Sequence, residues 1–301
     1  MRRTALRIVP VVLLASCSSS PSDRSQHILF DDFSYRSLEA FRGNGWIART
    51  AVGWPGIAGA TWSDNVSFVD DPAGAGNRLV RMTASTDGTT TRQAQLCHQR
   101  KYLEGTYAAR VRFSDGPVSG PDGDQIVETF YTIAPLKAPL DPDYSEQDFE
   151  YLPNGGWGGG DLTLHTTTWE TFRPEPEWLQ VSTSNARRGS LDGWHTLVLQ
   201  IANHEVRYFL DGAPLATHGE PYYPEDHMSI NFNLWFIREG LIASREPRVY
   251  TEDVDWVLHA AGSVLSPGEV QQQVAALRKA GVAFRDTVPA MQPPLASPCD
   301  F

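Results

Sequence analysis

Three acidic residues alternate along the segment Glu146-Gln147-Asp148-Phe149-Glu150. In an extended strand, residues i, i+2 and i+4 point to the same face, so the three carboxyl groups would lie side by side. Like charges held this close raise one another's proton affinity, and selection for stability alone rarely builds such a row. Glycoside hydrolysis uses this arrangement, because it needs one ionised carboxylate to attack the sugar and one protonated carboxyl group to protonate the leaving oxygen.

The residues around the acids indicate where such a strand lies. Alternating acids also occur on the exposed face of an edge strand, where charge discourages aggregation. Here, however, Tyr144 and Leu152 continue the face of the acids, while Phe149 and Tyr151 occupy the opposite face. Both faces are therefore partly apolar, which favours an interior strand with a functional row of carboxyl groups.

The pattern Glu146-x-Asp148-x-Glu150 resembles the signature of glycoside hydrolase family 16. The other segments that resemble this family, in its order, are Phe30–Phe33, Gly105–Val111, Trp194–Thr196 with Tyr208–Gly212, Asn233–Trp235 and Val254–Val257. Together they span most of residues 27–261. The resemblance implies an all-β fold, a β-sandwich jelly roll of the concanavalin A-like type, and retaining, endo-acting cleavage of polysaccharides. Short alternating stretches separated by turn residues agree with an all-β class.

The resemblance also assigns roles to the three acids. Glu146 would be the nucleophile, Glu150 the general acid that later acts as base, and Asp148 the residue between them that biases their protonation. In a retaining enzyme the two carboxyl groups should lie ~5–5.5 Å apart. On a flat strand the Cα atoms of residues four apart are ~13 Å apart, so we expect a curved strand with side chains that lean inward.

The spacing of the acids gives an indication of the substrate. No residue is inserted before Glu150, as in licheninases and xyloglucan enzymes, whereas laminarinase-like members often carry one extra residue that marks a β-bulge. The pair Tyr144-Ser145 stands where licheninases commonly have Trp-Asp. We expect a β-1,3- or β-1,3-1,4-glucan as substrate. The alternatives are a xyloglucan or glucan transglycosylase and a non-catalytic carbohydrate-binding protein on the same fold.

Sugar binding needs flat apolar surfaces for stacking and polar groups that pair with hydroxyls. Trp235 and Asn233 share one strand face and match family positions that line the cleft. Further candidate binding residues are Tyr144, Trp157 in a glycine-rich turn, Trp169 and Gln95. His165 either reaches the site or has a packing role, and Trp194 and Trp256 are expected in the core.

Other chemistries find little support in the sequence. It contains no His-Glu-x-x-His, Cys-x-x-Cys, Gly-x-Ser-x-Gly or Walker motif. The net charge is −11. Such a surface repels phosphate backbones, so nucleic acid is excluded as a partner. We expect a monomer that binds a polysaccharide and needs no cofactor for catalysis.

The N-terminal segment resembles a targeting signal. Arg2, Arg3 and Arg7 precede a short apolar stretch, and Leu14-Ala15-Ser16-Cys17 looks like a bacterial lipobox. We expect a lipoprotein signal peptide over residues 1–16, lipidation of Cys17 and a Ser/Pro-rich tether over residues 17–26. The protein would then be exported and held at the cell surface by its lipid anchor. The alternative is ordinary cleavage and secretion of a free enzyme.

The sequence after residue 261 predicts a helix and an extended tail over residues 262–301. Ser266, a proline and Glu269 form a helix start with a capping box, and Gly281 marks the stop. Cys97 and Cys299 either pair, which would pin the tail to the sheet, or Cys97 is free and buried.

A structural calcium ion is a further implication of the family resemblance. Many members bind this ion partly through an aspartate of the closing strand, and Asp255 occupies that place here. Carboxylate oxygens are the hard ligands that calcium prefers.

Overall fold

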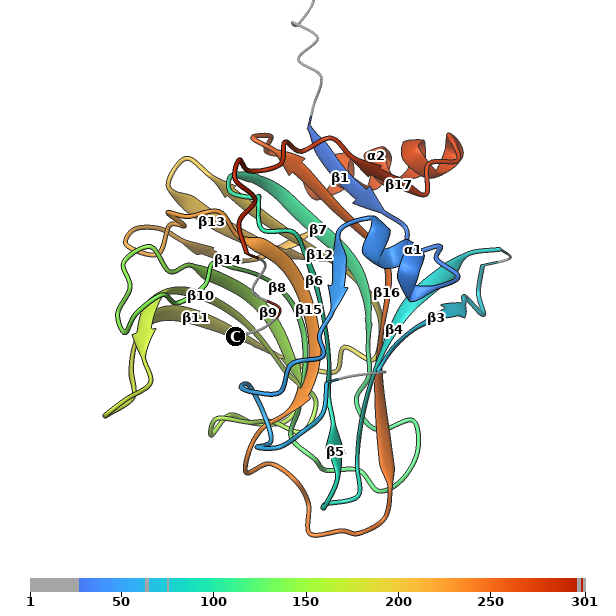
Figure 1. Cartoon of the computed structure of the whole chain (residues 1–301), viewed down its shortest axis with the longest axis vertical. Coiled ribbons are helices and arrows are strands. Elements are labelled where there is room, and N and C mark those ends of the chain that lie inside the picture. The colour runs from blue at the N-terminus through green and yellow to red at the C-terminus, as the bar shows by residue number, and fades with distance from the viewer. Residues whose placement is uncertain (1–26, 63–64, 75, 297–298, 300–301) are drawn as a thin grey trace, which may run out of the picture.

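The computed structural model describes residues 27–62, 65–74, 76–296 and 299. The predicted signal peptide, Cys17 and the tether lie outside these residues. Within them, the strands form a seven-stranded and a ten-stranded sheet that pack face to face (Figure 1). The chain is thus an all-β sandwich of the jelly-roll type, as predicted.

The seven-stranded sheet carries the acidic row. Its strands, in spatial order, are β11 (Leu179–Arg188), β10 (Thr163–Arg173), β9 (Glu146–Leu152), β8 (Ile126–Ile133), β15 (Ser229–Phe236), β6 (Ala94–His98) and β2 (Trp46–Ala48). All neighbouring pairs in this sheet are antiparallel.

The ten-stranded sheet forms the second layer. Its main path is β14 (Ala213–His218), β13 (Glu205–Leu210), β12 (Gly193–Ala202), β7 (Gly105–Phe113), β16 (Arg248–Ala261), β1 (Ile28–Asp31) and β17 (Phe284–Asp286). Beside β16 lies β4 (Arg78–Thr86), which also pairs with β3 (Val66–Asp70) and β5 (Thr91–Arg92). The helices are α1 (Leu38–Gly43) and α2 (Pro267–Lys279).

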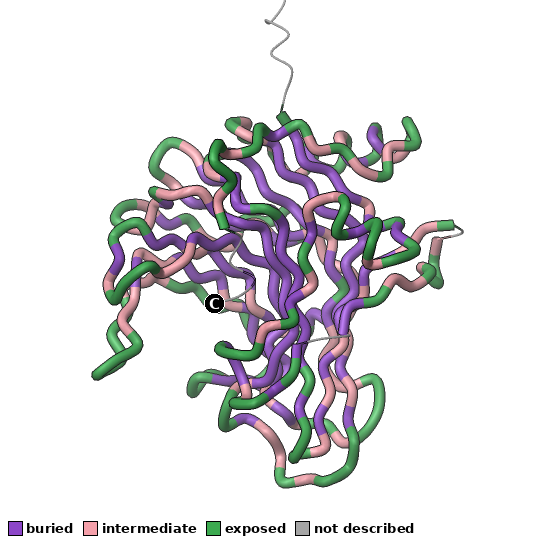
Figure 2. Tube along the Cα trace, viewed as in Figure 1, coloured by how far each residue is buried: buried purple, intermediate pink, exposed green. Residues whose placement is uncertain are grey.

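The main hydrophobic core lies between the two sheets. Alternate residues of the central strands point into it, and these strands are largely buried, whereas the loops are mostly exposed (Figure 2). On the seven-stranded sheet, Phe149 of β9 stacks on Phe130 of β8 with ring centroids 6.1 Å apart, and Phe130 stacks on Phe232 of β15. Phe149 therefore lies on the core face of β9, and the acids, which alternate with it, must point to the other side of the sheet.

Helix α2 begins as the sequence predicts. Ser266 accepts a hydrogen bond from the amide of Glu269, and the Glu269 side chain bonds back to the Ser266 backbone, which completes the capping box. The buried face of the helix packs on the outer side of the ten-stranded sheet, where Leu277 joins a second apolar cluster with Trp256. Trp256 is buried, as predicted, whereas Trp194 is half-buried.

The segment after α2 contributes a strand that the sequence did not predict. β17 pairs antiparallel with β1, with Phe30 opposite Arg285. The segment after α2 is therefore joined to the sandwich by main-chain hydrogen bonds at Phe284–Asp286. The signal for β17 is only three residues long, and its partner lies at the other end of the chain.

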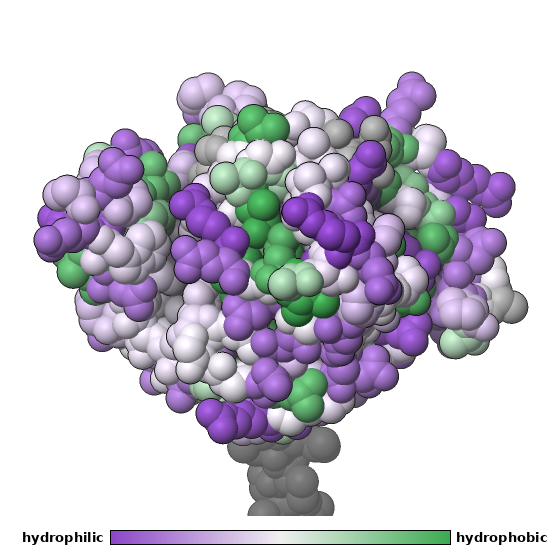
Figure 3. All heavy atoms as spheres, turned by 90° about the horizontal axis from the view of Figure 1, so that it is seen from below, coloured by the Kyte–Doolittle hydropathy of each residue, from purple (hydrophilic) through white to green (hydrophobic). Residues whose placement is uncertain are grey.

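The lower surface of the molecule is mixed in character. Seen from below, a hydrophobic patch lies in the middle of a largely hydrophilic face (Figure 3). Among the described residues, neither helix has the length and apolar character needed to cross a membrane.

Truncation of Leu277 should test the contribution of α2 to stability. The side chain is buried between the helix and the sheet. Leu277→Ala should lower the free energy of unfolding by about 2–3 kcal/mol, because it removes apolar contacts and leaves a cavity. Chemical denaturation would measure the change, with Gln272→Ala on the exposed side of α2 as control. Equal stability of the two variants would contradict the packing of α2.

Candidate active site

The three acids share the outward face of β9, in the middle of the seven-stranded sheet. Glu146, Asp148 and Glu150 pair in register with Trp169, Thr167 and His165 of β10. On the other side they pair with Ile133, Tyr131 and Thr129 of β8. Neither register shifts along β9, in agreement with the unbulged form of the motif. Paired residues point to the same face of a sheet, so the neighbours of the acids surround them on both sides.

A cavity of about 580 Å³ lies over this face. Its lining residues are Trp54, Pro55, Thr129, Tyr131, Ile133, Glu146, Asp148, Glu150, Trp157, His165, Thr167, Trp169, Trp178, Gln180, Ser182, Ser184, Asn233 and Trp235. The structure thus brings together the three acids and most of the predicted binding residues, namely Trp235, Asn233, Trp157, Trp169 and His165. A cavity of this size, with aromatic walls and a polar floor, is suited to a small organic ligand or part of a larger one.

Tyr144 does not line the cavity. It lies just before β9, is buried, and packs with Tyr131 and Ile133. Its hydroxyl group donates a hydrogen bond to Oε2 of Glu146. We therefore correct its predicted role: Tyr144 positions Glu146 and is not a residue that contacts the substrate.

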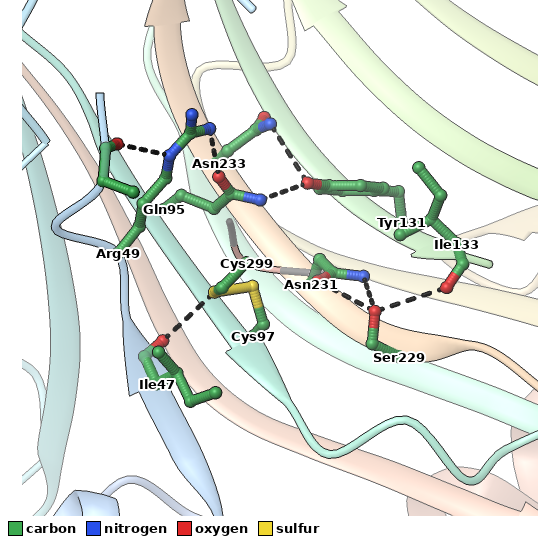
Figure 4. Close-up of a disulfide and its surroundings, with 11 residues drawn as sticks. Ile47, Arg49, Gln95, Cys97, Tyr131, Ile133, Ser229, Asn231, Asn233 and Cys299 are labelled. Atoms are coloured by element: carbon green, nitrogen blue, oxygen red, sulfur yellow. Dashed lines mark hydrogen bonds between the residues drawn. A yellow bond between two sulfur atoms is a disulfide. The ribbon is translucent and has the colours of Figure 1, made fainter. Parts of the chain in front are cut away.

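Gln95 also lies outside the lining. Its amide nitrogen donates to the hydroxyl oxygen of Tyr131 at 2.7 Å, and its amide oxygen accepts a hydrogen bond from Nη1 of Arg49 at 2.9 Å (Figure 4). Asn233 Nδ2 donates to the same Tyr131 oxygen at 3.3 Å. Gln95 therefore holds Tyr131 in place from the β6 side, and its predicted role in substrate binding is corrected accordingly.

Sequence reasoning missed Trp54, Trp178 and Tyr131. The indole groups of Trp54 and Trp178 are 57% and 51% exposed, and that of Trp157 is 54% exposed. Single exposed apolar side chains are common, but all three of these border one cavity, and such a gathering marks a ligand-binding groove. The sequence does not distinguish Trp54 and Trp178 from buried tryptophans, because their exposure depends on how the loops around them fold.

The three carboxyl groups differ in proton affinity. Burial raises the pKa of Glu146 to about 7, although hydrogen bonds from Tyr144 and Asp148 oppose the rise. Burial and the nearby charge of Glu146 raise the pKa of Glu150 to about 8. The pKa of Asp148 rises well above its usual range, because burial and the charges of Glu146 and Glu150 disfavour its ionised form.

This order of pKa values gives each acid a distinct chemical state. Glu146 ionises first and can act as a nucleophile, while Glu150 keeps its proton and can act as an acid. Asp148 stays protonated, donates to Glu146, and accepts a hydrogen bond from the indole nitrogen of Trp169 at 3.1 Å. The site therefore holds an ionised and a protonated carboxyl group side by side near neutral pH.

Solved structures with a similar fold include glycoside hydrolases. The Bacillus licheniformis beta-glucanase has a TM-score of 0.55 at 14% identity, over 79% of this chain and 99% of its own. A family 16 endo-glucanase from Bacteroides ovatus, in complex with G4G3G-2F-DNP, has a TM-score of 0.57 at 17% identity, over 76% and 98% of the two chains. The kappa-carrageenase from Pseudoalteromonas carrageenovora, in complex with an oligotetrasaccharide of kappa-carrageenan, has a TM-score of 0.55 at 13% identity, over 83% and 99%.

These similarities establish the fold. The chain has the jelly-roll architecture of the family 16 hydrolases, as the resemblance in the sequence implied. No protein-family model matches the sequence, and no curated protein matches it either.

The surroundings of Asp255 do not fit a calcium ion. Arg278 of α2 donates to its Oδ1 at 2.6 Å, and Arg110 of β7 donates to its Oδ2 at 3.1 Å. Asn77 is a third donor residue, with a hydrogen bond to Oδ1 at 2.9 Å. Positively charged side chains thus take the place of a cation. Among the described residues, no group of three or more His, Cys, Asp or Glu side chains could hold a metal. The role of Asp255 as a calcium ligand is corrected to that of an ion-pair acceptor.

Chelation and substitution should separate the two roles of Asp255. Excess EDTA should leave the melting temperature unchanged, because guanidinium groups already neutralise the carboxylate. Arg278→Ala should lower the free energy of unfolding by about 1–2 kcal/mol, a modest value because Arg110 and Asn77 remain and Arg278 is partly exposed. Lys279→Ala, one residue further along α2, is the control. A melting temperature that falls with EDTA and recovers with added calcium would contradict the ion-pair role.

Proposed function

We propose that the protein is a retaining glycoside hydrolase that cleaves a β-linked polysaccharide by double displacement. The observation that carries the proposal is the row of three carboxyl groups with unequal proton affinities on the floor of an aromatic cavity. The fold shared with family 16 hydrolases supports it. Fold alone would not suffice, because one architecture hosts many functions.

Each step of the proposed reaction uses the protonation states described above. In the first step, the Glu146 carboxylate attacks the anomeric carbon of the sugar while Glu150 transfers its proton to the glycosidic oxygen. The bond between these two atoms breaks, and a glycosyl ester of Glu146 forms. In the second step, Glu150 takes a proton from water, the resulting hydroxide attacks the anomeric carbon, and Glu146 leaves as a carboxylate. Both acids return to their starting states.

Asp148 has a positioning role in this scheme. It donates a hydrogen bond to Glu146 and is itself held by Trp169. Its proton stabilises the negative charge of Glu146 before attack and after release. This explains why a third acid lies between the other two at a cost in electrostatic repulsion.

The walls of the cavity support a neutral sugar chain as the substrate. Trp54, Trp157 and Trp178 offer flat faces for stacking on sugar rings. Ser182 and Asn233 add polar groups that can pair with hydroxyl groups. The acidic net charge of the protein disfavours sulfated glycans. Within the proposal, a β-1,3- or mixed-linkage β-glucan is the preferred substrate.

Export to an oxidising compartment is part of the proposal. Cys97 of β6 and Cys299 form a disulfide, with Cα atoms 5.7 Å apart. Disulfides of this structural kind persist outside the reducing cytosol. The predicted lipid anchor at Cys17 would place the enzyme where it meets extracellular polysaccharides.

Replacement of the nucleophile should abolish cleavage. Glu146→Gln should lower activity roughly 10³-fold or more, since no other group can form the glycosyl ester. Glu150→Gln should lower it by about 10²–10⁴-fold through loss of proton transfer. The assay uses mixed-linkage and β-1,3-glucans, xyloglucan, galactans and agarose, with new reducing ends and product sizes as readouts.

The control for these variants is Glu170→Gln, an acid of β10 outside the cavity lining. It should keep wild-type activity. Binding of a polymer without cleavage by the wild type would overturn the hydrolase and point to a carbohydrate-binding protein. Products longer than the substrate would show transfer to a second sugar in place of water.

The pH dependence of kcat/KM should follow the two catalytic acids. Activity should rise as Glu146 ionises near pH 7 and fall as Glu150 loses its proton near pH 8. Tyr144→Phe removes a hydrogen bond that lowers the pKa of Glu146, so its acid limb should move to higher pH. Initial rates at low substrate concentration across pH 4–10 would measure both limbs.

The matched control is Tyr151→Phe, the same change on the opposite face of β9, where the hydroxyl group donates to Asp115. Both limbs of the pH profile of Tyr151→Phe should stay at their wild-type positions. An acid limb near the ordinary pKa of glutamate, about 4.3, would contradict the role of burial at this site.

A further inference from the structure

The outward face of the seven-stranded sheet is open on one side and covered on the other. On the side of β10 and β11, Ser182 and Ser184 line the cavity and remain accessible. On the side of β15 and β6, Asn231 and Gln95 lie on the same face but are 0% and 1% exposed. Part of the chain must therefore cover the face on this side.

A sugar chain in the active site would run directly toward the covered side. Glu146 and Glu150 lie on one strand and must flank the bond that breaks, so the glycan has to pass between them, across the strands and over Asp148. The residues along this path are in register, in the order Ser184, Thr167, Asp148, Tyr131, Asn231 and Cys97. Cys97 is three strands from Asp148, ~14 Å at the usual strand spacing.

The disulfide stands at the covered end of this path. Cys299 is joined to Cys97, whose register partner on β15 is Asn231, and is itself buried (Figure 4). The tail that carries Cys299 is also held upstream, where the ammonium group of Lys101 bonds to Asp286 at 2.7 Å and to the carbonyl of Val288 at 2.8 Å. The described parts of this tail are thus held at two points, by a covalent bond at Cys299 and by polar contacts at Asp286 and Val288.

The polar side chains under this cover are already paired. Asn231 Nδ2 donates to the hydroxyl oxygen of Ser229 at 2.9 Å, and Gln95 is bonded to Arg49 and Tyr131. The hydrogen-bonding groups of Asn231 and Gln95 are thus paired within the protein. This part of the face therefore needs no sugar hydroxyl groups as hydrogen-bond partners.

The segment between β2 and β3 forms a second part of the wall. Arg49 donates to the carbonyl groups of Ala51 at 2.9 Å and Trp54 at 3.0 Å, and Gln93 donates to that of Pro55 at 3.3 Å. The indole ring of Trp54 lies 6.5 Å from the ring of Phe172 on β10. The segment between β2 and β3 therefore reaches from one edge of the sheet to a side chain of β10, near the other edge.

We infer that the cavity is closed on the β6 side, so that a glycan enters from the β11 side and only a short oligosaccharide fits between the acids and the wall. The inference rests on the proposed function. The family resemblance implies attack within polysaccharide chains. A closed end predicts instead the release of short products of uniform length from one end of the chain.

The experiment compares product lengths and solution viscosity for the full chain and variants that open the wall. Wild type should release one short product size, and viscosity should fall slowly relative to the number of new reducing ends. Cys299→Ser combined with Trp54→Ala should give longer and more varied products and a faster fall in viscosity per bond cut. Reduction of the wild-type disulfide by dithiothreitol should shift the products in the same direction, which provides a test that needs no substitution.

The control is Trp178→Ala on the open side, which should raise KM without changing the product size. Random products with a rapid loss of viscosity from the wild type would overturn the closed end. So would an unchanged product size in both the double variant and the reduced protein, at retained activity. Absence of any cleavage that depends on Glu146 would overturn the proposed function, and the closed end with it.

Discussion

The alternation of side chains along β9 is the constraint on which the rest of the structure depends. Phe149 packs into the core between the sheets, and the acids on either side of it point outward. A shift of the strand register by one residue would place all three carboxyl groups in the apolar core. The aromatic packing of β9 against β8 therefore fixes the fold and the direction of the acids at once. Catalytic geometry and core stability cannot vary independently here.

Burial of the three carboxyl groups opposes their ionisation, and the site uses this effect to set their protonation states. Each of the three carboxyl groups has a raised pKa, because the ionised form is poorly solvated on the cavity floor. Hydrogen-bond donors then decide which group ionises first. Glu146 receives bonds from Tyr144 and Asp148, whereas only burial and the charge of Glu146 act on Glu150. A small difference in local donors thus separates the pKa values of the proposed nucleophile and the proposed acid on a single strand.

The sequence predicted the features that depend on local pattern. The strand with the acids follows from alternation, and α2 follows from its capping box. The features it did not predict depend on contacts distant in sequence. Trp54 reaches the cavity through a loop held by Arg49, and Asp255 meets Arg278 only because α2 packs on β16. For the two cysteines both states remained open, because no local signal indicates that a partner 202 residues away will lie opposite Cys97.

The C-terminal segment contacts both sheets of the sandwich. α2 packs on the outer face of the ten-stranded sheet, β17 extends its edge beside β1, and Cys299 reaches the outward face of the other sheet. The segment therefore runs from one side of the sandwich to the other (Figure 1). A disulfide that closes so long a loop reduces the conformational freedom of the unfolded chain. Because the same bond lies at the end of the path through the acids, the inferred closed end would make one element both stabilise the fold and limit how much of a sugar chain the site can hold.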